Sequence, residues 1–329
     1  MIKFVTFGET MVQYNAEYLG SYDKNGSHLS DIAGAESNVA INLSRISDEN
    51  LQSLWISRLG NDNEGNLIAN TISSKIEMVA DLYDGEKTGI SYLNHYEKNV
   101  HKKKYERKGS AATKINFELI SPHIKDADLL HITGITPAIS NLCRNTIFKA
   151  VQKCEDLNIP ISLDVNYREQ LWSSQEAKET IDQIRHSATI FKVGYDEAER
   201  IWAKGLSPSE YAKFFYSNNI IVITNNADET ILYDGENLIT VENIPVNLID
   251  PIGAGDAFMA GFIKSIFSTT KYIKKILSFN KCDRRKILEQ AIRIGNICGS
   301  LTCTRKGDTS GMPTIEEIDS HLQKYYYNI

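Results

Sequence analysis

The sequence predicts an α/β protein in which helices cover a mainly parallel sheet. From residue 129 onward, segments of helical spacing separate apolar runs at 129–132, 161–165, 190–193 and 220–224. Buried strands that alternate with helices are typical of parallel sheets. Two polar and aromatic stretches, 11–32 and 88–108, precede this region, and we expect them to form a small lid sheet. No linker composition divides the chain, so 1–329 is predicted to be a single domain.

The individual elements follow from local patterns. The apolar run 2–7 predicts a buried strand, and Gly34 precedes a helix. In the second lid stretch, Ile90, Tyr92, Asn94 and Tyr96 occupy every second position, and this alternation predicts a two-stranded excursion. Residues 147, 151, 154 and 157 are apolar on one helical face. Further expected elements are a strand at 54–60 and helices at 67–76 and 287–301.

Composition excludes several functions. Of the 329 residues, 42% are hydrophobic and 24% charged, and the net charge of −6 gives no case for nucleic acid or a membrane surface. The basic run 101–104 is interpreted as a solvated face. No apolar run has membrane-spanning length. Five scattered cysteines without a CxxC pair argue against a zinc site and favour a reducing cytoplasm.

The segment 250–263 is the strongest chemical signal. Gly253, Ala254 and Gly255 form a small-residue turn before a helical run, and such a helix start suits phosphate. Asp256 follows directly. A carboxylate would repel an anion bound at this helix start, but it could accept a proton from a group beside that anion. A kinase that acts on a hydroxyl needs this pairing, although an acid in an ordinary first helical turn is the alternative. The segment matches neither Walker A nor the dinucleotide fingerprint.

Four more segments occur in order along the chain, at 8–9, 34–40, 58–65 and 164–172. Together with the turn at 250–256 they resemble the PfkB family of ribokinase-like sugar kinases, over essentially the whole chain. The resemblance implies a ribokinase-like three-layer αβα sandwich with a mainly parallel central sheet and a small β-sheet lid.

The resemblance also implies phosphoryl transfer from Mg²⁺-ATP, in which positioning and charge stabilisation carry most of the catalysis. It makes Asp256 the general base and the backbone N–H groups of 252–256 an anion hole. Mg²⁺ would be held mainly by phosphates and water, with Glu197 acting through water. The residues implied on the nucleotide side are Asn166, Arg168, Thr224, Asn226, Asp228, Glu229, Gly253, Ala254 and Gly255.

The chain departs from the family pattern on that same side. Gly194 stands where the family has asparagine, and the loop 225–230 lacks the Gly-x-x-Gly pattern. Because of these two departures, the sequence does not decide which residues position the water molecules on Mg²⁺ or which residues contact adenine. A monovalent cation near Asp250 and 298–304 is a further possibility that the sequence does not decide.

The substrate side points to an acid sugar. Tyr105 and Arg107 resemble the lid segment of 2-keto-3-deoxygluconate kinases, and strand alternation makes the two side chains face the same way. A guanidinium can donate two parallel hydrogen bonds to a carboxylate, a group that a neutral sugar lacks. Arg168 is expected as a second arginine at the pocket. The implied substrate-binding residues are Gly34, Ala35, Asn38, Tyr92, Tyr105, Arg107, Arg168 and Asp256.

These residues predict ATP-dependent phosphorylation of 2-keto-3-deoxygluconate at O6, within a modified Entner–Doudoroff route. The alternatives are a fructokinase or another sugar or nucleoside kinase, or a non-catalytic sugar- or nucleotide-binding protein. Arg107 and Arg168 would then pair with protein carboxylates. Gluconate and galactonate derivatives are not separated by sequence. Because the aromatic lid would otherwise expose apolar surface, we also expect a homo-oligomer formed through the lid.

Overall fold

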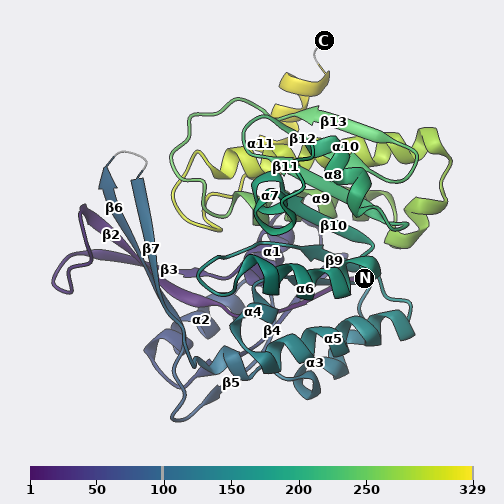
Figure 1. Ribbon diagram of the computed structural model, residues 1–329. Coiled ribbons are helices and arrows are strands. Elements are labelled where there is room, and N and C mark those ends of the chain that lie inside the picture. Colours follow the sequence, from purple (N-terminus) through teal and green to yellow (C-terminus); the bar gives the residue numbers. More distant parts are fainter. Residues whose placement is uncertain (98–99, 328–329) are drawn as a thin grey trace.

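A computed structural model describes residues 1–97 and 100–327 (Figure 1). Its centre is a nine-stranded sheet in the order β13-β12-β11-β10-β9-β8-β1-β4-β5. The strands from β11 to β5 pair in parallel, whereas β12 and β13 add an antiparallel edge. The bounds are β1 (Ile2–Phe7), β4 (Leu51–Gly60), β5 (Glu77–Tyr83), β8 (Leu129–Thr133), β9 (Ile161–Asp164), β10 (Ile190–Gly194), β11 (Ile220–Asn225), β12 (Glu229–Tyr233) and β13 (Leu238–Glu242).

Helices cover both faces of this sheet because its inner strands are apolar on both sides. On one face lie α1 (Ala35–Arg45), α2 (Asn63–Ser73), α9 (Ala254–Thr269) and α10 (Lys281–Thr302), with α11 (Ile315–Leu322) packed on α10. On the other lie α3 (Phe117–Ile124), α4 (Thr136–Ile139), α5 (Asn141–Asp156), α6 (Ser174–Ile184), α7 (Tyr195–Trp202) and α8 (Pro208–Phe215). Short helical turns span Ala111–Lys114, Arg185–Ser187, Ile273–Ser278 and Gln323–Tyr327.

A second sheet of four strands projects from one side of the sandwich, at the left of Figure 1. Its order is β3-β2-β6-β7, and it forms the lid. The bounds are β2 (Met11–Leu19), β3 (His28–Ala33), β6 (Ile90–Glu97) and β7 (Val100–Glu106). Two stretches that are distant in sequence meet where β2 pairs in parallel with β6.

The predicted three-layer sandwich with a lid is confirmed, with some differences in the elements. The helix expected at 67–76 lies at Asn63–Ser73, because the Asp62 side chain accepts the Gly65 N–H at 2.7 Å and caps the helix there. The edge strand β5 was not predicted, since its half-exposed residues carry no clear alternation. The last long helix begins at Lys281, earlier than residue 287, behind an Asn280 cap.

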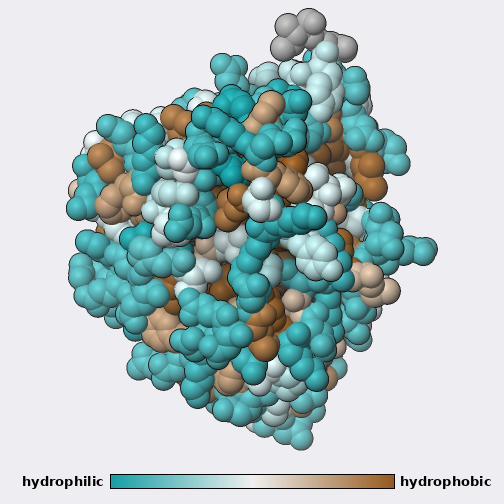
Figure 2. All heavy atoms as spheres, turned by 90° about the vertical axis from the view of Figure 1, so that its right-hand side faces the viewer, coloured by the Kyte–Doolittle hydropathy of each residue, from teal (hydrophilic) through white to brown (hydrophobic). Residues whose placement is uncertain are grey.

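The surface is mostly polar. Figure 2 shows one face on which small apolar groups are scattered among hydrophilic side chains. Among the residues that the structure describes, no helix combines the length and the apolar character needed to cross a bilayer.

Candidate active site

A cleft lies between the lid and the carboxyl ends of the central strands, where open α/β sheets bind ligands. It brings together most of the predicted sugar-side and catalytic residues from four separate parts of the chain. These are Gly34, Ala35, Asn38, Tyr105, Arg107, Arg168, Gly253 and Asp256. The cleft is also lined by four residues that the sequence did not single out, namely Met11, Ala33, Ile135 and Asp308, and by Glu9, Lys103 and Ile252, which lie in segments noted from the sequence.

The glycine turn forms the N-terminus of α9. Gly253 is the N-cap residue with φ 81°, and a Cβ there would lie 2.5 Å from the backbone oxygen of Asp308. The first N–H groups of a helix have no partner within it, so they are available to an anion. The Ile252 N–H instead donates to the Asp250 carboxylate at 3.1 Å. The expected set of donors at 252–256 therefore loses its first member.

Asp256 lies in the first turn of α9 and is buried. The Asn38 amide donates to its carboxylate at 2.8 Å and to the Asp308 carboxylate at 3.2 Å. Burial raises the pKa of Asp256 to about 7, although the Asn38 hydrogen bond opposes this rise. No local pattern in the sequence distinguishes Asp256 from an ordinary aspartate, which is a weak base with a pKa of about 3.9. A carboxylate with a pKa near the working pH is a stronger base than an exposed one.

This pKa predicts a pH profile. The ionised form of Asp256 accepts the proton, so we expect kcat/KM to be level above about pH 7 and to fall roughly tenfold per unit below it. Steady-state rates between about pH 5.5 and 8.5 test this, with circular dichroism to confirm that the protein stays folded. Replacing Asn38 with alanine removes the bond that lowers this pKa and is expected to move the midpoint upward. A midpoint below about pH 5 in the wild type would contradict the assignment.

Two charged residues of this site were missed by sequence reasoning. Lys192 on β10 is 6% exposed and pairs with Asp164 on β9 at 2.9 Å. Burial lowers the pKa of Lys192, but Asp164, with Glu197 and Asp256 nearby, raises it above its ordinary value overall. Its Nζ lies 3.2 Å from the position a Cβ would take on Gly255, so a positive charge lies close to the glycine turn. A lysine inside the apolar run 190–193 was the available signal.

Asp308 is the second missed residue, and no local pattern marks it. Burial raises the pKa of its carboxyl group, and Lys103 and the Asn38 amide oppose the rise. Asp308 and Asp256 thus share one amide donor at the cleft. The remaining Asn38 oxygen is buried and has no partner in the described part of the chain, so it is free to accept from a sugar hydroxyl.

Arg107 reaches the cleft but is already paired. Its Nε donates to the Glu9 carboxylate at 2.6 Å, and its Nη2 forms an ion pair with the same oxygen. Ser110 donates to the other Glu9 oxygen at 2.6 Å. Both charged side chains are buried, at 9% and 2% exposure. The sequence alternative that Arg107 pairs with a protein carboxylate is what the structure shows, and removing Arg107 would strand a buried Glu9 charge.

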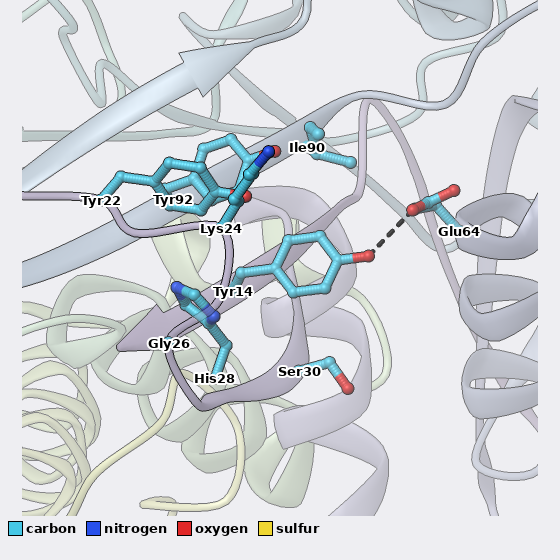
Figure 3. Close-up of a pocket in the computed structure, with 9 residues that line it drawn as sticks. All are labelled: Tyr14, Tyr22, Lys24, Gly26, His28, Ser30, Glu64, Ile90 and Tyr92. Carbon is cyan, nitrogen blue, oxygen red and sulfur yellow. Dashed lines mark hydrogen bonds between the residues drawn. The ribbon is translucent and has the colours of Figure 1, made fainter. Parts of the chain in front are cut away.

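Tyr92 does not belong to the cleft, so its predicted substrate role is corrected. In the lid register, Tyr92 lies opposite Lys104, whereas Ser91 lies opposite Tyr105. Side chains alternate along a strand, which places Tyr92 on the other face of the lid from Tyr105. There it lines a pocket with Tyr14 and Tyr22, in which the Tyr14 hydroxyl donates to Glu64 at 2.8 Å (Figure 3).

The aromatic rings of this outer lid face pack against one another. The centroids of Tyr22 and Tyr92 lie 4.3 Å apart, and those of Tyr14 and Tyr92 lie 5.7 Å apart (Figure 3). Part of the apolar surface that motivated the expected homo-oligomer is therefore covered within the lid itself. Association through the lid stays a prediction.

The residues predicted for the nucleotide side lie outside the lining of the cleft, except Arg168 and Gly253. Arg168 is half-exposed, and its Nη1 donates to the Tyr167 carbonyl at 2.9 Å. The predicted wall from Thr224 to Glu229 comprises the end of β11, the turn at 226–228 and the first residue of β12. The Asn226 side chain donates to Asp196 on α7 at 3.0 Å, and within the turn the Asp228 N–H donates to the Asn225 carbonyl. Asn166 has φ 42° and a buried side-chain oxygen with no partner among the described residues.

Glu197 has a structural task that the sequence did not reveal. Its carboxylate accepts the Gly194 N–H at 2.9 Å and the Tyr167 N–H at 2.7 Å, so it caps α7 and ties it to the chain after β9. Burial raises the pKa of Glu197. Within 1–97 and 100–327, no group of three or more His, Cys, Asp or Glu side chains is arranged to hold a metal ion.

The parallel sheet, its lid and the acid at a glycine-capped helix start define the class of α/β sugar kinases. Residues 1–315 match the pfkB family of carbohydrate kinases, and the chain belongs to this family. It is 27% identical to 2-dehydro-3-deoxygluconokinase of Bacillus subtilis (strain 168), over 97% of this chain and 94% of that protein. It is 26% identical to probable fructokinase-2 of Arabidopsis thaliana, over 97% and 95%.

The solved structures include a putative ribokinase II from E. coli with a TM-score of 0.80, which covers 99% of this chain and 100% of that one. At 21% sequence identity this likeness shows the fold alone. The ribokinase-like sandwich and the family inferred from the sequence are both confirmed.

Proposed function

We propose that this carbohydrate kinase transfers the γ-phosphoryl group of ATP to O6 of 2-keto-3-deoxygluconate, giving 2-keto-3-deoxy-6-phosphogluconate. The observation that carries the proposal is Asp256, buried at the start of α9 with a pKa raised by burial to about 7, in a cleft that Arg107 and Arg168 also line. The similarity to a 2-dehydro-3-deoxygluconokinase supports the choice of substrate.

The proposed chemistry follows from the groups at the cleft. Asp256 accepts the proton of the O6 hydroxyl, while Asn38 holds its carboxylate in place and offers a free oxygen to the sugar. The N–H groups of Gly253, Gly255 and Asp256 stabilise charge on the transferred group. The ammonium of Lys192 close to Gly255 adds a fixed positive charge on the same side. Mg²⁺ bound to the ATP phosphates would neutralise part of their charge.

A second candidate, a fructokinase, is favoured by one specific observation. Glu9 already neutralises Arg107, so this arginine does not offer an unpaired charge to a substrate carboxylate. Fructokinases are also nearly as similar in sequence as the deoxygluconokinase. The substitution Arg107→Ala does not separate the two activities, because it would leave Glu9 buried and unpaired with either sugar.

The direct test is a sugar panel with ATP and Mg²⁺, in which ADP release is followed by a coupled assay. We expect kcat/KM for 2-keto-3-deoxygluconate to exceed that for fructose or ribose by at least about tenfold, since each charge-assisted hydrogen bond contributes roughly 1.5–3 kcal/mol. Phosphorus NMR of the product identifies the phosphorylated oxygen. The Asp256→Asn protein, prepared in parallel, excludes a contaminating kinase. A preference for fructose or ribose would refute the substrate assignment.

A further inference from the structure

Lys103 lies on the same lid strand as Tyr105 and Arg107. The three occupy alternate positions of β7 and its end, and all three line the cleft. The side chains between them point away: Lys102, Lys104 and Glu106 are exposed, whereas Lys103 and Tyr105 are half-buried and Arg107 is buried. The basic run interpreted from the sequence as one solvated face is therefore divided between two faces of the lid.

The other cations near the cleft are already engaged. Arg107 is held by Glu9 through two of its nitrogens. Arg168 follows the end of β9 in the chain. Its Nη1 donates to a backbone carbonyl and lies 4.0 Å from the Oε1 of Glu197. On the outer face, Lys104 pairs with Glu106 at 2.7 Å.

Lys103 differs from these cations. Within the described residues it has no hydrogen bond and no ion pair, and its Nζ lies 5.6 Å from the centroid of the Tyr105 ring. Its four-carbon stem can carry the ammonium group across the cleft at little cost.

The cleft also needs such a cation. Besides Glu9, whose charge Arg107 neutralises, Asp256 and Asp308 line it, so an incoming carboxylate would meet two acidic side chains. Like charges brought together away from water are costly, and one uncommitted ammonium on the lid side offsets that cost. The charge of Lys103 already acts on the Asp308 carboxyl group across the cleft.

We propose that Lys103 binds the carboxylate of the acid-sugar substrate and so sets the preference for an acid over a neutral sugar. This inference rests on the proposed function. Arg107 and Glu9, as a neutral pair, then shape the floor of the pocket and bind hydroxyl groups. The Tyr105 ring lies between the two cations, with its centroid 5.6 Å from the Lys103 Nζ and 5.6 Å from the Arg107 guanidinium carbon. Specificity for the acid comes from a side chain on the lid rather than from the sandwich.

The experiment compares Lys103→Met with Lys104→Met. The two substitutions remove the same charge from neighbouring positions of one strand, and methionine keeps most of the stem. Each protein is assayed with 2-keto-3-deoxygluconate and with its neutral analogue, in which a hydroxymethyl group replaces the carboxylate. For Lys103→Met we expect KM for the keto acid to rise about 10- to 100-fold, as for the loss of one charge-assisted hydrogen bond. Its kcat, its KM for ATP and its KM for the analogue should stay within about twofold.

Lys104→Met should behave as the wild type, and Lys103→Arg should restore most of the keto-acid affinity. If Lys103→Met keeps the wild-type KM for the keto acid, the role of Lys103 is overturned. The proposed function is still supported in that case, provided that the wild-type protein phosphorylates the keto acid. An equal loss with acid and analogue also overturns it, because Lys103 would then act through Asp308 or the lid fold. A wild type that does not phosphorylate the keto acid refutes the proposed function, and the role of Lys103 with it.

Discussion

Replacing Asp256 with asparagine is expected to lower kcat by about 10²–10⁴-fold, as for the loss of a general base. The amide keeps the size of the side chain and can still accept the hydrogen bond from Asn38, so the KM values for ATP and sugar should change little. Single-turnover measurement of ADP formation separates the chemical step from product release.

Asp308 supplies the matched control for this experiment. It is a second buried carboxylate at the same cleft, and it accepts from the same Asn38 amide. Asp308→Asn should retain kcat within about tenfold, because in our assignment Asp308 does not take the proton. If Asp308→Asn lost as much turnover as Asp256→Asn, or if Asp256→Asn retained near-normal turnover, Asp256 would not be the sole base.

The same Asp256→Asn substitution should stabilise the protein. Burial raises the pKa of Asp256 in the folded protein from 3.8 to about 7, so ionising it costs folding free energy. The cost is absent below about pH 4, grows as the pH rises from there to about 7, and is constant above that. We expect an increase on the order of 1–3 kcal/mol in the free energy of unfolding at pH 8, and almost none at pH 4. Thermal denaturation at the two pH values measures this, and an equal Tm for both proteins at pH 8 would argue against a buried charge.

The second large effect is expected for Gly253→Ala. Gly253 has φ 81°, a conformation that L residues rarely adopt, and the added Cβ would lie 2.5 Å from the Asp308 oxygen and 2.9 Å from its Cα. Both contacts are with backbone, so the turn itself must shift. Because the N–H groups of this turn are proposed to stabilise the transferred phosphoryl group, we expect kcat to fall about 10²–10³-fold. Stopped-assay kinetics measure the fall in kcat, and thermal denaturation separately measures the loss of stability that comes from the shifted turn.

Gly205→Ala is the control for backbone strain alone. Gly205 has φ 62°, lies in the exposed connection between α7 and α8, and would place its new Cβ in open space. Its substitution should destabilise the protein by about 1–2 kcal/mol, as expected for a left-handed conformation, with kcat unchanged. An active Gly253→Ala protein with the stability loss of Gly205→Ala would show that the turn does not form the anion site.

Much of the fold was predictable because the local signals were strong. Apolar runs such as Ile161–Asp164 and Ile190–Gly194 are buried on both faces, and this pattern has few readings other than a central parallel strand. Where residues are half-exposed, as in β5, the pattern weakens and the strand was not predicted. The first residue of a helix depended on capping side chains, such as Asp62 and Asn280, whose hydrogen bonds act over three residues.

The site was predictable to the extent that its chemistry lies in short segments. The turn from Gly253 to Asp256 and the alternation of Tyr105 with Arg107 are local features, and the cleft contains both. The predicted substrate role of Tyr92 was wrong because strand alternation shows which residues share a face of the lid, but not which of the two faces borders the cleft. The strand register decides that, and register depends on the pairing of two segments.

By itself, the sequence determined the alternation of the central strands with helices, the glycine turn and the presence of an acid beside it. The tertiary structure alone decided how the charges are partnered. Arg107 meets Glu9 across 98 residues, and Asn38 reaches Asp256 and Asp308 across 218 and 270. The same contacts bury Asp256, and burial changes an ordinary aspartate into a base with a pKa of about 7. Desolvation and Coulomb energy depend on distance in space, which a linear pattern does not contain.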